Sequence, residues 1–176
     1  VGKISLNSHY NELDLSSTYD SIVRCPDESC AYEMINEIKK VAKDGDTVGG
    51  EITTVAKNVP VGLGEPVFDK LNASLAKAML SINAVHSFKY GFLNSDISSS
   101  KGSQVNDILL DRSGLTKTNF SAGILGGLSN GNDIYCTVSF KPVSTIMRDQ
   151  DSINKDGDKI KIKGIGRHDA CVVPRA

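Results

Sequence analysis

The sequence has no excess of charge of either sign and no long apolar stretch. Its 20 lysines and arginines are balanced by 21 acidic residues, which gives a formal net charge of -1 at pH 7. This balance provides no general attraction for nucleic acid or an anionic membrane, so any anion must be bound locally. No apolar run approaches the roughly 20 residues needed to cross a bilayer, and VGKISLNSHY does not resemble a signal peptide. We therefore predict a soluble, cytoplasmic protein with neither nucleic-acid nor membrane partners.

The cysteines and histidines also lack the spacing that is typical of metal ligands. Cys25, Cys30, Cys136 and Cys171 form no C-x-x-C pair, and the three histidines lie far apart in the sequence. Structural zinc sites need clustered cysteine and histidine ligands, so we predict no metal site. In the cytoplasm the four thiols are expected to be reduced, with two disulfides as the alternative.

The length and the ends of the chain bear on its organisation. With 176 residues the chain can bury one sizeable core, and we predict a single domain over residues 1–176. The chain begins on Val1 instead of methionine and stops at PRA, just after the apolar residues CVV. We interpret both ends as those of a fragment of a longer protein.

Two segments have the apolar spacing of a helix that packs one face into a core. The first follows Pro26 and Asp27, which are typical of a helix amino terminus, and ends before Gly45. The second is predicted to start at Pro66, after the glycine turn of PVGLGEP, because proline is tolerated in the first helical turn. The buried stripe expected on this second helix consists of Phe68, Leu71, Leu75, Ala78, Met79 and Ile82.

Three segments are predicted as strands. β-Branched residues favour a strand in GDTVGGEITTVAKNVP, although two glycines interrupt its alternation. In the second segment, apolar and polar residues alternate from Ile134 to Phe140, after a tight hairpin turn predicted at Asn130 and Gly131. The third segment follows the turn NKDGD and has three lysines that we expect on a solvated face: Lys159, Lys161 and Lys163.

The combined pattern predicts an α+β fold in which helices alternate with antiparallel, hairpin-joined strands. Residues 93–118 are polar, with Ser98, Ser99 and Ser100 consecutive. Loops of this length within a compact domain are usually lids, binding loops or disordered segments. We expect a long polar loop there.

Two short motifs have residues suited to a ligand. The glycines of AGILGG let a backbone approach a ligand closely, but they can equally serve a bend or close strand packing. In KPVST, one cation and two hydroxyls follow a strand, and this combination suits a phosphate group. The second motif therefore predicts an anion site, whereas the first is ambiguous by itself.

The closing stretch GRHDACVVPRA contains three consecutive ionisable residues. In an extended chain the side chains alternate between faces, so Arg167 and Asp169 are predicted on one face and His168 on the other. Arg167 and Asp169 then share a site, or they only neutralise one another at a strand end. No catalytic triad, Cys/His pair or pair of carboxylates can be assembled from spacing. The residues alone therefore predict an α+β domain with an anion pocket.

Four stretches together resemble the chorismate synthase family. They are PVGLGEPVFDKLNASLAKAMLSINAV, AGILGGLSNGNDI, FKPVSTI and GRHDACVVPRA, in the family's order and at its separations. The resemblance covers most of the chain from Cys25 to Ala176 and is weak in residues 1–24 and 93–118. It implies a β-α-β sandwich of the chorismate synthase type, with an antiparallel sheet and packed helices.

The resemblance also implies a reaction and a cofactor. Members of the family are lyases of the shikimate pathway, which leads to aromatic amino acids. They remove phosphate from 5-enolpyruvylshikimate 3-phosphate by a 1,4-anti elimination that gives chorismate. The reaction consumes no net electrons but requires reduced FMN, so the flavin acts transiently while the protein supplies orientation and electrostatics. Assembly into a homotetramer is implied as well.

Residues that match the family's motifs receive roles by the same resemblance. Asp169 is expected to be a catalytic carboxylate that relays a proton near the flavin, and Arg167 to lie beside flavin and substrate. Gly126 matches the glycine that approaches the flavin, and Asn83 and Ala84 match contacts after the second helix. The remaining expected FMN contacts, near its phosphate end, are Lys141, Pro142, Val143, Ser144 and Thr145.

The chain departs from the family pattern in two ways. Ala122, Ala170 and His86 replace a usual glycine, proline and lysine without removing an expected contact. In addition, the family's G-E-S-H-G motif, a second essential histidine and most of the substrate-binding arginines do not occur in these 176 residues. We therefore predict that this chain alone is inactive. The alternative is a non-catalytic module that binds an anion or mediates assembly.

Overall fold

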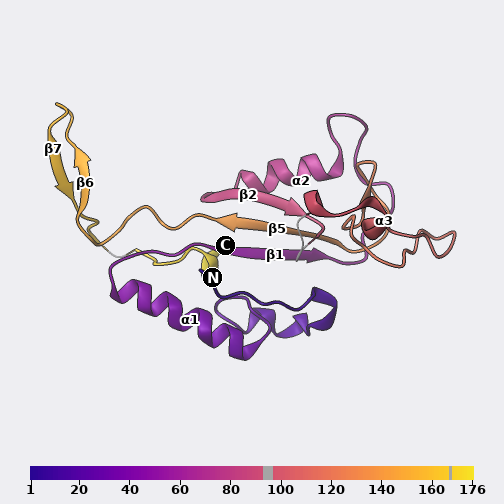
Figure 1. The fold of residues 1–176 in the computed structure, drawn as a ribbon, viewed down its shortest axis with the longest axis horizontal. Helices are drawn as coiled ribbons and strands as arrows, with labels where there is room; N and C mark the ends of the chain where they lie inside the picture. Colours follow the sequence, from indigo (N-terminus) through magenta and orange to yellow (C-terminus); the bar gives the residue numbers. More distant parts are fainter. Residues whose placement is uncertain (93–96, 167) are drawn as a thin grey trace. The chain divides into compact units, whose positions relative to one another are not determined.

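The computed structural model describes residues 1–92, 97–166 and 168–176. The chain forms two compact units, which are considered separately: unit 1 comprises Val1–Glu51 and Phe140–Ala176, and unit 2 comprises Ile52–Ser139. Helices are combined with small sheets (Figure 1), and the predicted α+β class is confirmed. None of the helices in the described ranges has the length and apolar character needed to cross a bilayer.

The main sheet has the strand order β1-β5-β2 and lies mostly in unit 2. Its strands are Gly50–Ala56 (β1), Ile134–Phe140 (β5) and Val85–Tyr90 (β2). Figure 1 shows β5 running antiparallel to both neighbours. The predicted strands in both regions are confirmed. As the central strand, β5 is buried along almost its whole length, so its alternation does not separate a core face from a solvated face.

Hydroxyl groups pair across this sheet. Thr137 Oγ1 lies 2.9 Å from Thr53 Oγ1, and Ser87 Oγ lies 2.6 Å from Ser139 Oγ. Thr137 is only 5% exposed. Because a buried hydroxyl needs a hydrogen-bond partner, the cross-strand pair explains how a polar residue is tolerated in the central strand.

Helix α2 (Leu71–Leu80) lies alongside β2. The prediction that it starts at Pro66 is wrong, because Val67 has a φ of 64° and Phe68 is 88% exposed. The N–H of Leu71 donates instead to the carbonyl of Gly127 at 2.7 Å. The helix therefore begins where a carbonyl from a distant part of the chain satisfies its first N–H. The expected apolar stripe is half-buried at Leu71, Leu75 and Met79, and exposed at Phe68, Ala78 and Ile82.

A tight turn at Gly126 and Gly127 joins β3 (Ile124–Leu125) to β4 (Leu128–Ser129). The two glycines have φ values of 62° and 92°, as a type I′ hairpin turn requires. The hairpin turn predicted at Asn130 and Gly131 is wrong, because this pair leads from β4 into β5 and these strands do not pair. The Asn130 side chain instead accepts the N–H of Asn132 at 3.0 Å, which makes a local side-chain turn.

The described part of the predicted loop 93–118 contains only short elements. Ile97–Ser99 (η3) is a 3₁₀ turn, Gly102–Val105 (α3) is a single helical turn, and Leu109 and Thr116 form an isolated antiparallel bridge. Residues 93–96 lie outside the described residues. The rest of this segment is irregular, in line with the predicted loop.

Unit 1 is built on α1 (Glu28–Lys43). The Asp27 side chain caps this helix by accepting the N–H of Cys30 at 2.6 Å, so the predicted start of the helix is confirmed. Ala31 and Met34 are buried on the inner face of the helix. The other buried apolar residues of this unit are Val1, Tyr10, Val23, Cys25, Phe140, Cys171 and Val173.

Short elements complete unit 1. Three of them are 3₁₀ turns, at Tyr10–Glu12 (η1), Leu15–Tyr19 (η2) and Val173–Arg175 (η4). An antiparallel hairpin joins β6 (Gln150–Ile153) to β7 (Lys159–Ile162). Every residue of β7 is exposed, and Lys161 Nζ lies 2.6 Å from the Asp151 carboxylate. This exposure agrees with the solvated face expected for the lysines.

Candidate functional site

The loop after β5, residues 141–145, is held by contacts with the stretch that leads into β1. Thr47 Oγ1 donates to the carbonyl of Val143 at 2.7 Å. A Cβ built on Gly49 would overlap the carbonyl oxygen of Phe140, so glycine is needed there for close approach of the two segments. Lys141 and Ser144 are exposed on the loop, and Thr145 is half-buried. An anchored loop thus presents a cation and two hydroxyls, an arrangement suited to a phosphate.

The closing segment is held by the same stretch of chain. Val48 N–H donates to the carbonyl of Ala170 at 2.8 Å. A Cβ on Gly50 would lie only 2.7 Å from Val173 Cγ2, so the missing side chain makes room for the closing segment. Cys171 and Val173 are 3% and 2% exposed, which makes them the apolar anchors of this segment.

The two held segments line one cavity of about 500 Å³. Its lining residues are Val143, His168, Asp169, Val172 and Arg175. Asp169 Oδ2 lies 2.9 Å from Arg175 Nε, and both side chains are partly exposed. Such a pair adds little to stability, but it orients the carboxylate. The structure therefore brings two predicted site residues, Val143 and Asp169, to the same cavity, while Arg167 lies outside the described residues.

The predicted alternation of side chains across residues 167–169 assumed a strand, and this assumption is wrong. The described residues from 163 to 172 form no strand, and η4 follows them. His168 lines the same cavity as Asp169 instead of an opposite face, and its Nε2 lies 3.2 Å from the carbonyl oxygen of Ile165. Burial of Cys171 and the hydrogen bond to Ala170 determine the path of this segment, and neither contact is a sheet ladder.

In unit 2, the predicted flavin contacts lie at opposite ends of α2. Asn83 and Ala84 follow its carboxy-terminal end, where Ala84 has a φ of 69°. Gly126 lies in the β3–β4 turn, next to the Gly127 carbonyl that accepts the first N–H of the helix. A helix of this length rises about 15 Å, so Gly126 and Asn83 do not contact one another. Nothing lies within 4 Å of a Cβ built on Gly126, so its backbone is open to a ligand.

Asp107, which has no role in the sequence predictions, holds the segment that leads into the β3–β4 hairpin. Its carboxylate accepts hydrogen bonds from Thr118 Oγ1 at 2.7 Å and from the N–H groups of Phe120 and Ser121 at 2.8 Å each. Burial on its own would raise the pKa of Asp107, but the hydrogen bonds from Ser121, Thr118 and Phe120 outweigh burial and lower it.

Asn119 extends this network towards β3. Its Oδ1 accepts the N–H of Gly123 at 2.8 Å, and its Nδ2 donates to the carbonyl of Asp133 at 2.8 Å. The hydroxyl of the buried Tyr135 donates to the Asn119 carbonyl at 2.6 Å. Gly123 directly precedes β3, so the network sets the position of the hairpin that carries Gly126. Bonds between separate turns leave no local pattern in a sequence, which explains why this network was missed.

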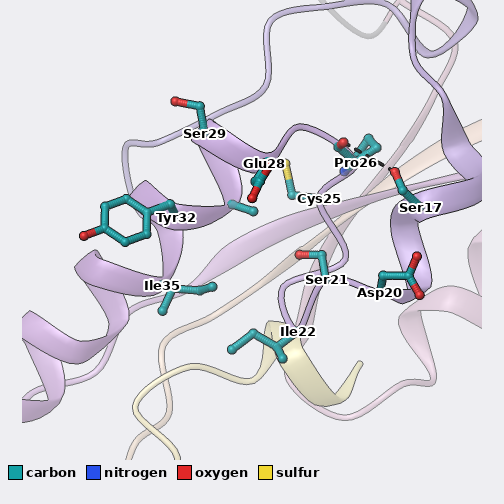
Figure 2. Close-up of a pocket in the computed structure, with 11 residues that line it drawn as sticks. Ser17, Asp20, Ser21, Ile22, Cys25, Pro26, Glu28, Ser29, Tyr32 and Ile35 are labelled. Atoms are coloured by element: carbon teal, nitrogen blue, oxygen red, sulfur yellow. Dashed lines mark hydrogen bonds between the residues drawn. The ribbon is translucent and has the colours of Figure 1, made fainter.

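Another cavity in unit 1, of about 910 Å³, lies between residues 17–26 and α1 (Figure 2). No sequence pattern indicated it. Its wall combines hydroxyls, carboxylates, a thiol and apolar side chains: Ser17, Asp20, Ser21, Ile22, Cys25, Pro26, Glu28, Ser29, Ala31, Tyr32 and Ile35. We refer to it below as the α1 groove.

The site lies in an α+β protein and combines an anchored polar loop with a cavity that contains a carboxylate. Comparisons with known proteins give the family of this chain. The family model for chorismate synthase matches residues 2–176. The chain is 56% identical over 176 residues to chorismate synthase of Christiangramia forsetii and 53% identical over 178 residues to that of Flavobacterium psychrophilum. The chain therefore belongs to the chorismate synthase family, as the sequence motifs predicted.

These matches cover 100% of this chain and 49% of each relative. The chain thus spans about half the length of the curated relatives it matches. A crystal structure of chorismate synthase matches with a TM-score of 0.66 and 31% identity, over 72% of this chain and 39% of that one. This structural match confirms the predicted fold type.

Replacing Asp107 by alanine should lower the free energy of unfolding by about 2 kcal/mol, because the groups that it accepts from lose their partner. Asp111→Ala is the matched control. Asp111 accepts from the N–H and hydroxyl of Ser113 at 2.8 and 2.5 Å, but it is exposed, so water can replace it. Urea unfolding followed by circular dichroism measures both variants, and equal effects would contradict the role of Asp107.

The stabilisation by Asp107 should also depend on pH. Folding lowers the pKa of this carboxyl from about 3.8, so its charged form stabilises the fold at higher pH. That contribution is lost as the pH falls through the lower pKa of the folded state. The difference in unfolding free energy between the unmodified chain and Asp107→Asn should therefore shrink from about pH 5 to about pH 2. If this difference in unfolding free energy did not change with pH, the charge of Asp107 would be ruled out as the source of the stabilisation.

Proposed function

We propose that this chain is the flavin-binding part of an enzyme that converts 5-enolpyruvylshikimate 3-phosphate to chorismate and phosphate. The observation that carries the proposal is the 56% identity to Christiangramia forsetii chorismate synthase across the whole chain. The reaction is a 1,4-anti elimination in the shikimate pathway, and aromatic amino acids are made from its product. The cofactor proposed is reduced FMN.

The donors of the 141–145 loop fit the phosphate group of FMN. Lys141 offers a cation and Ser144 and Thr145 offer hydroxyls, while Pro142 and the Thr47–Val143 hydrogen bond stiffen the backbone between them. Bound there in its reduced form, FMN would supply a transient electron that helps phosphate to leave without net oxidation. The role of the loop is to bind and orient the phosphate end of the cofactor.

Further contacts are proposed on unit 2. The exposed backbone at Gly126 allows a planar ring to approach closely, because no side chain intervenes. Asn83 and Ala84 provide an amide side chain and a backbone in the left-handed region at the other end of α2. Because about 15 Å of helix separates these places, we assign them to different parts of the cofactor.

Asp169 is the proposed proton carrier. Its Oδ2 is occupied by Arg175 Nε at 2.9 Å, so Oδ1 is the oxygen that can accept a proton beside the substrate ring. The cavity admits small groups while Arg175 keeps the carboxylate in one orientation. Arg167, outside the described residues, is proposed to lie beside flavin and substrate.

We further propose that the 176 residues alone do not turn over. No G-E-S-H-G motif occurs among them, and the two carboxylates and the phosphate of the substrate need several cations. Homotetrameric assembly and a cytoplasmic location are the remaining parts of the proposal, and they rest on membership of the family.

The proposed phosphate contact predicts a difference between two flavins. Lys141→Ala should weaken FMN binding at least about tenfold, since a charge-assisted hydrogen bond is lost. Riboflavin lacks the phosphate, so its affinity should change little. Lys163→Ala, which removes an exposed lysine outside the loop, is the control. Flavin fluorescence titrations of the unmodified chain and of both variants measure the affinities for the two flavins. Equal losses for FMN and riboflavin in Lys141→Ala would contradict the assignment of Lys141 to the phosphate.

The role of Asp169 is tested in a chimaera that joins this chain to the part of the Christiangramia forsetii enzyme that it does not span. Asp169→Asn should lower turnover by about 100-fold or more, because the proton carrier is lost. His168→Gln, which changes the neighbouring side chain of the same cavity, should have a much smaller effect. Phosphate release under anaerobic conditions is the measurement. A larger loss with His168→Gln would reverse the assignment.

A further inference from the structure

The α1 groove is acidic and partly apolar. Asp20 and Glu28 are its charged residues, and no lysine or arginine of the described chain lines it. Ile22 and Tyr32, on opposite walls, are 64% and 67% exposed (Figure 2). The charge extends beyond the groove, since Arg24 is the one basic residue of the stretch 11–37, which contains seven acidic residues: Glu12, Asp14, Asp20, Asp27, Glu28, Glu33 and Glu37. A segment with apolar side chains and positive charge would complement this surface.

The groove also contains a hydroxyl group that lacks a partner. Ser21 Oγ is buried and forms no hydrogen bond within the described part of the chain. Figure 2 shows this side chain pointing from residues 17–26 towards α1. A buried hydroxyl usually has a hydrogen-bond partner, and a backbone N–H or carbonyl of a bound segment would provide one.

Residues 159–165 (KIKIKGI), which we call the β7 segment, have the complementary chemistry. Three lysines alternate with isoleucines, and no acidic residue occurs among them. All of these residues except Gly164 are exposed, and Ile165 is 90% exposed. The segment therefore presents apolar side chains and positive charge together.

The β7 segment also has a free backbone edge. Among the described strands β7 pairs only with β6, so its other edge keeps unpaired N–H and C=O groups. A two-stranded hairpin is only marginally stable by itself in water, so a partner that covers this edge stabilises it. Lys161 pairs with Asp151, but no ion pair within the described residues involves Lys159 or Lys163. These two lysines are available to a partner.

The hairpin lies at the wrong end of α1 to fill the groove of its own copy. Met147 N–H donates to the Gly45 carbonyl at 2.9 Å, and Arg148 Nε donates to the Asp44 carbonyl at 2.6 Å. These bonds fix the base of the hairpin at the carboxy-terminal end of α1, and Figure 1 shows the hairpin pointing away from the helix. The groove lies at the amino-terminal end, and a helix of this length rises about 24 Å. The β7 segment that fits the groove therefore belongs to another molecule.

We propose that the α1 groove binds the β7 segment of a second copy of this chain. The isoleucines of the segment pack against Ile22 and Tyr32, its lysines approach the two carboxylates of the groove, and its free edge meets Ser21 Oγ. Both surfaces lie on unit 1, so two copies related by a twofold axis make the contact twice, each groove holding the other copy's segment. The contact does not depend on the proposed reaction.

The oligomeric state of the 176-residue chain tests this contact. We expect a monomer–dimer equilibrium in sedimentation velocity at rising protein concentration. Two double variants, Asp20→Lys with Glu28→Lys (the groove reversal) and Lys159→Glu with Lys163→Glu (the β7 reversal), change exposed side chains. Each should raise the dissociation constant of the dimer at least about tenfold, because like charges then face one another. Circular dichroism checks that both variants are folded.

Two further double variants with the same changes of net charge are matched controls. Glu33→Lys with Glu65→Lys changes exposed acidic residues outside the groove. Lys39→Glu with Lys77→Glu changes exposed lysines outside the β7 segment. Both controls should leave the dissociation constant nearly unchanged. If they weaken the dimer as much as the reversals do, net charge and not the groove governs association, and the proposal fails.

Mixing the two reversed variants tests the pairing itself. The basic groove of one variant then meets the acidic β7 segment of the other, and the acidic groove of the second meets the basic segment of the first. A mixed dimer should form with a dissociation constant close to that of the unmodified chain, although neither variant dimerises well alone. The proposal is overturned by a mixture that does not recover, by a dimer that is insensitive to both reversals, or by an unmodified chain that stays monomeric at every concentration.

Discussion

The candidate site of unit 1 depends on the five-residue stretch from Asp46 to Gly50. Thr47 holds the loop 141–145 through the Val143 carbonyl, and Val48 holds the closing segment through the Ala170 carbonyl. Neither segment belongs to a sheet at these points, so these hydrogen bonds and the glycines at 49 and 50 are what bring them close. Without this stretch, the polar loop and the Asp169 carboxylate would have no common cavity.

In unit 2, too, hydrogen bonds from distant residues hold irregular backbone in place. Its open glycine turn is held from one side by the N–H of Leu71 and from the other by Asn119 and Asp107. Asp107 is ionised and accepts only, so it can satisfy several donors of the irregular segment before β3. In both units, hydrogen bonds from distant residues anchor irregular backbone, and several residues proposed to meet the ligand are exposed, namely Lys141, Ser144, Asp169 and Gly126.

Features that depend on neighbouring residues can be predicted from the sequence, whereas features that depend on contacts between distant segments cannot. Helix α1 could be placed because its cap, Asp27, is its immediate neighbour. The start of α2 could not be predicted, because the carbonyl of Gly127, and not a nearby side chain, accepts its first N–H. The residue types of the closing segment predict a strand, whereas its path follows from the contacts of Ala170 and Cys171 with distant residues. The flavin-site residues came from family motifs, since spacing alone gave only an anion loop.

We propose above all that this chain supplies the flavin-binding part of a chorismate synthase. The most direct test is phosphate release from 5-enolpyruvylshikimate 3-phosphate by the unmodified chimaera, with the absorbance of the flavin followed at the same time. We predict many turnovers for each reduced FMN, with no net flavin oxidation and no activity when the flavin is oxidised. Release that proceeds equally well without flavin, or a chimaera that binds FMN but makes no chorismate, would contradict the claim.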